Sequence, residues 1–88
     1  MIERMREEVL KWVKQHIDIT DDVDITIDDV YVVWSVKALQ NWKALISTTL
    51  PDGMYYELTY NGDKDKLYLD AYKKFDNIKI LINKEGKQ

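Results

Sequence analysis

Residues 2–17 carry apolar side chains at spacings of three and four, which is the periodicity of one helix face. Charged side chains fill the opposite side, and Gly and Pro are absent from this stretch. The pattern predicts an amphipathic helix over 2–17, in which Trp12 and His16 are four residues apart and can stack. The apolar stripe consists of Ile2, Met5, Val9, Trp12, Val13 and either His16 or Ile17.

Residues 30–73 alternate between apolar and polar positions, and groups of turn residues interrupt the alternation three times. This pattern predicts an antiparallel meander of four strands. In the second turn, Pro51 suits the first turn position and Gly53 suits the left-handed one. The predicted turns lie at 40–42, 51–53 and 61–64, and the predicted fourth strand at about 66–73.

A single register through these turns keeps the apolar residues of all four strands on one face. For the third turn we prefer a four-residue loop. A six-residue loop would place Glu57 opposite Asp70, a like-charge pair that costs roughly a few tenths of a kcal/mol or more. The pairs expected from this register are Val36 with Ile46, Ile46 with Leu58, and Leu58 with Leu67.

The two faces of the predicted sheet differ in character. The helix is expected to cover the apolar face, which gives an α+β fold, an N-terminal helix on a four- to five-stranded antiparallel meander. The apolar face consists of Val32, Trp34, Val36, Ala38, Ala44, Ile46, Met54, Tyr56, Leu58, Leu67, Leu69 and Ala71. The opposite, polar and aromatic face consists of Tyr31, Val33, Ser35, Lys37, Leu45, Ser47, Thr49, Tyr55, Glu57, Thr59, Tyr68, Asp70 and Tyr72.

Two segments allow more than one interpretation. Residues 18–29 form an acidic connector, in which 24–27 is either a short edge strand or a turn capped by Thr26 and Asp29. In 77–83, isoleucines alternate with other residues, but a helical stripe fits as well. Because β-branched residues favour strands, we predict a fifth strand there.

The length of 88 residues limits the chain to a single domain over 1–88. Cysteine is absent, so disulfides and thiolate metal sites are excluded. No apolar run is long enough for a membrane span, and Met1 begins no signal-peptide pattern. We therefore expect the protein in the cytoplasm.

Candidate catalytic chemistry is sparse, and we expect no enzymatic activity, metal or cofactor. The one histidine, His16, falls on or beside the apolar stripe of the helix. Glu57 and Asp70 are the only carboxylate pair that can be placed together, and an open sheet face does not bury either as acid–base catalysis requires. The acidic connector lacks the ligand spacing, central Gly and closing Glu of an EF-hand.

The polar aromatic face is a candidate partner-binding surface, because Tyr buries a large area with few rotors. A homodimer through this face or through an edge strand is also compatible with the pattern. An alternative is a nucleic-acid or nucleotide binder that uses Tyr stacking with Lys37 and Lys43, although the pI near 5 disfavours it. The candidate contact residues are Lys37, Lys43, Tyr55, Glu57, Tyr68, Asp70 and Tyr72. The connector carboxylates that would steer a basic partner are Asp18, Asp21, Asp22, Asp24, Asp28 and Asp29.

The stretch VVWSVKALQNWKALISTTLPDGMYYELTYNGDK, followed by YLDAYKKF, resembles an uncharacterised family of small phage and prophage proteins of Gram-positive bacteria. The resemblance covers residues 25–80 and contains no catalytic motif, so it assigns no functional residues. It implies a mobile-element source and a role as an accessory protein that binds and inhibits or modulates a host protein.

Overall fold

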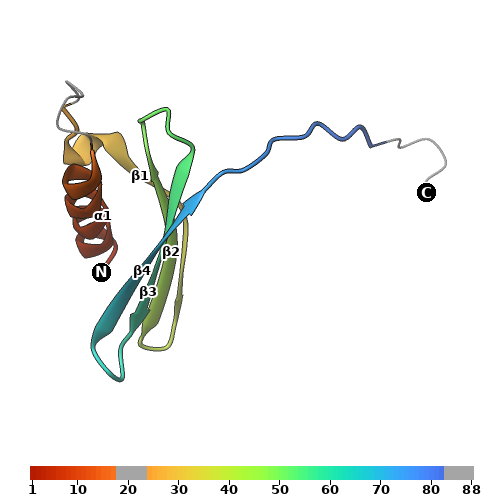
Figure 1. Cartoon of the computed structure of the whole chain (residues 1–88). Coiled ribbons are helices and arrows are strands. Elements are labelled where there is room, and N and C mark those ends of the chain that lie inside the picture. The colour runs from red at the N-terminus through yellow and green to blue at the C-terminus, as the bar shows by residue number, and fades with distance from the viewer. Residues whose placement is uncertain (18–23, 83–88) are drawn as a thin grey trace.

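The computed structural model describes residues 1–17 and 24–82, and the α+β architecture predicted from the sequence is confirmed. One antiparallel sheet has the strand order β1-β2-β3-β4, and α1 lies across one of its faces (Figure 1). The elements are α1 (Ile2–His16), the 3-10 turn η1 (Ile27–Asp29), β1 (Val30–Ala38), β2 (Asn41–Thr48), β3 (Met54–Asn61) and β4 (Lys66–Lys73).

The core lies between α1 and the middle of the sheet. Met5, Val9 and Val13 are buried along the helix stripe, as the spacing predicts. They join buried residues of β2 and β3, including Ile46 and Tyr56, in one hydrophobic cluster. The predicted stack of Trp12 on His16 is present, with ring centroids 3.7 Å apart and an interplanar angle of 13°.

Arg6 ties the helix to the start of β1. Its guanidinium donates from Nε to the Val30 carbonyl at 3.0 Å and from Nη2 to the Ile27 carbonyl at 2.8 Å. A third group, Nη1, donates to Glu3 one turn earlier. These bonds link α1 to the segment that leads into β1, and they hold the helix over the β1 side of the sheet.

The capped turn expected in the connector is confirmed, and the alternative strand is not formed. Thr26 and Asp29 make a capping box, in which the Thr26 amide donates to Asp29 Oδ2 at 2.9 Å. This backbone hydrogen bond lowers the pKa of Asp29 below 3.8, against a smaller opposing effect of desolvation. Residues 24–26 are irregular. The other predicted connector carboxylates, Asp18, Asp21 and Asp22, lie outside the described residues.

The predicted pairing of β1 with β2 is wrong. The turn contains two residues, Leu39 and Gln40, and the register shifts by one residue between Val32 and Trp34. A bulge therefore interrupts β1, and beyond it every side chain changes face relative to a regular strand. Trp34, Val36 and Ala38 leave the helix side, whereas Ser35 and Lys37 join it.

The predicted pairing of β2 with β3 is wrong by two residues but keeps the faces correct. Ile46 lies opposite Tyr56 rather than Leu58, because the connection from Thr48 to Met54 is longer than a three-residue turn. An even shift preserves the side on which each residue lies. Gly53 has φ +69, the left-handed conformation expected from the sequence.

The observed pairing of β3 with β4 is the register that we expected the like charges of Glu57 and Asp70 to disfavour. Glu57 lies opposite Asp70 and Leu58 opposite Leu69, rather than Leu58 opposite Leu67. Lys43 on β2 explains why the like-charge pair is tolerated, since its Nζ lies 3.7 Å from Glu57 Oε1 and offsets the repulsion. The predicted bounds of the fourth strand are confirmed.

Residues 74–82 form an extended arm without regular structure, so the predicted fifth strand is absent over 77–82; residue 83 lies outside the described part. The arm continues from β4 and runs away from the sheet (Figure 1). Its side chains are exposed throughout. At its start, the Lys74 amide donates to the Gly53 carbonyl at 2.7 Å.

Candidate functional site

The sheet face opposite α1, here called the uncovered face, carries large side chains that no described residue covers. Three of its cross-strand rows carry most of these side chains. Its largest exposed members are 43 to 53% exposed. They are Tyr31, Val33, Trp34, Val36, Tyr68 and Tyr72.

The register defines the rows, because residues opposite one another share a face. The first row is Tyr31, Ser47, Tyr55 and Tyr72; the second is Trp34, Leu45, Glu57 and Asp70; the third is Val36, Lys43, Thr59 and Tyr68. Apolar side chains gather on the β1–β2 half, and tyrosines flank two carboxylates on the β3–β4 half. The face is therefore amphipathic across the strands.

The bulge in β1 builds the apolar half of this face. In a bulge, two residues of one strand oppose one residue of the next, so Val33 and Trp34 both lie against Leu45. Without the extra residue, Trp34 and Val36 would point towards the helix. The only signal in the sequence is three consecutive apolar residues, Val32 to Trp34, which break the alternation.

Six of the seven predicted contact residues lie together on the uncovered face. Lys37 does not, because it pairs with Trp42 on the helix side, with its Nζ 5.4 Å from the Trp42 ring centroid. Lys43 is held by Glu57, so this face offers little positive charge for a phosphate backbone. The six residues brought together are Lys43, Tyr55, Glu57, Tyr68, Asp70 and Tyr72.

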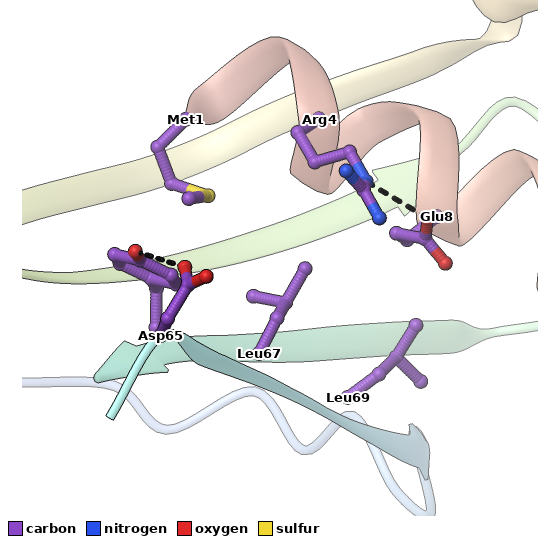
Figure 2. A pocket seen from close by; sticks show the side chains of 7 residues that line it. Met1, Arg4, Glu8, Asp65, Leu67 and Leu69 are labelled. Atoms are coloured by element: carbon purple, nitrogen blue, oxygen red, sulfur yellow. Dashed lines mark hydrogen bonds and ion pairs between the residues drawn. The ribbon is translucent and has the colours of Figure 1, made fainter. Parts of the chain in front are cut away.

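On the helix side, a cleft of about 400 Å³ lies between α1 and β4. Leu67 and Leu69 of β4 point towards the helix across this cleft (Figure 2). Its charged groups are paired: Arg4 Nε donates to Glu8 at 3.0 Å, and Tyr60 donates to Asp65 at 2.6 Å. The cleft thus contains an apolar strip, Leu67 and Leu69, beside two pairs of hydrogen-bonded polar side chains.

A smaller cavity of about 200 Å³ lies near the other end of the helix and is lined by Trp12, His16 and Tyr56 among others. Burial, and to a lesser degree the charge of Asp52, raises the pKa of Tyr56 to about 12. The hydrogen bond to Asp65 raises the pKa of Tyr60 above 10. Both shifts extend to higher pH the range over which these tyrosines stay neutral.

Within the described residues, no three His, Cys, Asp or Glu side chains gather as a metal-binding group would require. No helix in the same part of the chain is long and apolar enough to cross a membrane.

The model of a family of unknown function, DUF6275, matches residues 2–82 of the chain. No curated protein and no solved structure matches it. The family has no known function, so the match assigns no activity to this sequence. A function has to be inferred from the surfaces of the protein.

Proposed function

Since the chain belongs to this family of unknown function, we propose from its surfaces that it is a binding protein. It acts by stoichiometric association of its uncovered face with another protein, whose activity it inhibits or modulates. The supporting observation is the contiguous set of half-exposed aromatic and aliphatic side chains on one sheet face. Exposed apolar patches of this kind mark interaction sites.

The chemistry of the face fits a protein partner. Tyr and Trp are the residues that contribute most at protein interfaces, because they bury a large area and keep a polar group at the tip. Trp34, flanked by Val33 and Val36, would form the buried centre of the contact. Tyr68, Tyr72 and the Glu57–Asp70 pair would form its polar rim.

The source and place of action follow from the resemblance to small phage and prophage proteins. We propose that the protein is phage-encoded and acts on a host protein in the cytoplasm of a Gram-positive bacterium. Asp24, Asp28 and Asp29 lie at the start of β1, and their negative charge would steer a basic patch of the partner towards the adjacent uncovered face.

The test is affinity capture from a Gram-positive host lysate with three forms of the protein, each with and without nuclease. The forms are wild type, Trp34→Thr/Tyr68→Thr on the uncovered face, and the control Leu39→Asn, which changes an exposed side chain at the β1–β2 turn. Threonine keeps strand propensity, and asparagine tolerates the positive φ of Leu39 (+59).

We expect one protein captured at near-stoichiometric yield by wild type and Leu39→Asn, lost with the double variant, and unaffected by nuclease. The purified partner should bind the double variant at least tenfold more weakly than wild type, as for interface aromatics generally (on the order of 2 kcal/mol). Equal binding by wild type and the double variant would contradict the assignment of this face. Loss of the captured material after nuclease treatment would contradict the proposal that the partner is a protein.

A further inference from the structure

β4 is an edge strand with a free outer side. It pairs only with β3, so the backbone groups on its other side have no strand partner within the described residues. Free edges of this length are templates for another strand. On the helix side of this edge lies the cleft lined by Leu67 and Leu69, which are only partly buried (Figure 2).

The arm of the same chain has the features of the missing strand. Ile78, Ile80 and Ile82 occupy alternate positions, and all three are between 70 and 75% exposed. Phe75, at 101%, touches nothing. β-branched residues at a period of two are typical of a strand with one buried face, yet the arm lies free of the sheet in Figure 1.

We propose that residues 76–82 add as a fifth strand to the free edge of β4 in a second copy of this chain, and that the exchange is reciprocal. Antiparallel pairing of Ile80 with Leu69 extends the apolar surface of the cleft. In that register, Ile78 lies opposite Ala71 and Ile82 opposite Leu67, so the three isoleucines lie on the helix side.

The charges select the same register. Lys79 falls opposite Asp70, and Asp76 falls opposite Lys73, so two oppositely charged pairs form across the strands. Lys79 also relieves the like-charge pair of Asp70 with Glu57. A slip by one residue would instead put Lys79 among the leucines of the cleft and the isoleucines on the uncovered face.

The geometry favours a second copy over the arm's own sheet. Folding back in this register would need a two-residue turn at Lys74 and Phe75, whereas such turns favour Gly, Asn or Asp. The Leu39–Gln40 turn of the same chain forms without these residues, but it places Leu39 at a positive φ of +59. The Lys74 amide is moreover bonded to the Gly53 carbonyl, which continues the direction of β4. A two-fold axis between Lys74 and Phe75 gives both copies the same contacts in one continuous ladder.

The test uses the full chain and two charge reversals, Asp70→Lys and Lys79→Asp, both at exposed positions. Alone, each variant has two like-charge pairs per dimer. Mixed in equal amounts, they form a heterodimer in which Lys at 70 meets Asp at 79, and Asp70 meets Lys79. If the arm folded back within one chain, mixing would repair neither variant.

The readout is mass in solution, by native mass spectrometry and sedimentation, against the 10.5 kDa of one chain. We expect wild type to dimerise at micromolar concentration, each reversal to weaken the dimer about tenfold, and mixing to restore it as the heterodimer. Ile80→Asp should abolish dimerisation while leaving the circular dichroism of the domain intact. A monomeric wild type, a dimer that survives Ile80→Asp, or a mixture that stays as weak as its components would each overturn the proposal.

Discussion

The two faces of the sheet carry similar numbers of large side chains but serve different ends. On the helix side, Ile46, Tyr56 and Leu58 are buried under α1. On the uncovered face, residues next to them in sequence, such as Leu45 and Tyr55, lie among exposed neighbours. One face therefore holds the fold together, while the other is left exposed, and we propose that a partner covers it.

A small change in the backbone of β1 is enough to move side chains from the buried face of the sheet to the uncovered face. One extra residue in β1 turns Trp34 and Val36 away from the core, while Val30 and Val32, before the bulge, stay on the helix side. The domain thus gains an aromatic and aliphatic surface without losing its core, because Val30 remains buried.

The largest expected effect contrasts two neighbouring residues on opposite faces. Ile46→Ala removes a fully buried side chain and should lower the free energy of unfolding by about 3 kcal/mol. Leu45→Ala, the matched control on the uncovered face, should cost less than about 1.5 kcal/mol. Urea unfolding followed by circular dichroism measures both. Equal losses would mean that the two faces are not distinct.

A second contrast concerns the attachment of the helix. Arg6→Met removes the hydrogen bonds from the guanidinium to the Ile27 and Val30 carbonyls, and should cost about 1–3 kcal/mol. Arg4→Met loses only an exposed pair with Glu8 and should cost less than about 0.5 kcal/mol. The same unfolding experiment decides. Comparable losses would show that Arg6 does not hold α1 on the sheet.

The burial of Tyr56 on the helix side should make the free energy of unfolding depend on pH above pH 10. The pKa of Tyr56 is raised to about 12 by burial, whereas an unfolded tyrosine titrates near 10. The unfolded state therefore loses its proton first, so this contribution is complete below pH 10 and is lost as the pH rises from 10 through 12. Tyr56→Phe removes the ionisable group and should lose less stability over that range. Parallel curves for the two proteins would contradict the burial of the hydroxyl.

The smallest expected effect on stability lies on the uncovered face. Val36→Thr nearly keeps the shape of the side chain and, at an exposed position, should change the free energy of unfolding by less than about 0.5 kcal/mol. If Val36 instead faced the core, as in a strand without the bulge, a buried hydroxyl would cost about 1–3 kcal/mol. Thermal unfolding of the variant separates these outcomes.

The helix and the turns were predictable because each depends on residues close together in the sequence, through hydrophobic periodicity or turn-forming side chains. The stripe from Ile2 to Val13 specified the helix, and Gly53 marked a turn whose left-handed residue the structure contains. The capping pair Thr26 and Asp29 was equally readable, since both residues act within four positions of each other.

The register was not predictable, because the interactions that decide it are distant in sequence. The Glu57–Asp70 pair argued against the correct register when considered alone, and it is Lys43, on a third strand, that offsets it. The bulge at Val33 has no turn residue to announce it. As a result, Trp34 and Val36 were assigned to the core, and of the apolar half of the candidate site only Val33 and Leu45 were predicted correctly.

The fifth strand was predicted from the β-branched run after Phe75, but residues 77–82 of the single chain do not form a strand. Local pattern specifies that a segment suits a strand, and it does not specify which chain supplies the neighbouring strand. That distinction depends on the turn at Lys74 and Phe75, neither of which is a residue that two-residue hairpin turns favour.

The central claim is that the bulge places Trp34 on the uncovered face. Acrylamide quenching of a variant with Trp34 as its only tryptophan (Trp12→Phe/Trp42→Phe) tests this most directly. We predict efficient quenching and a red-shifted emission maximum for the free protein, as expected for a side chain that is 43% exposed. Blue-shifted emission that resists quenching would place Trp34 under the helix and contradict the account.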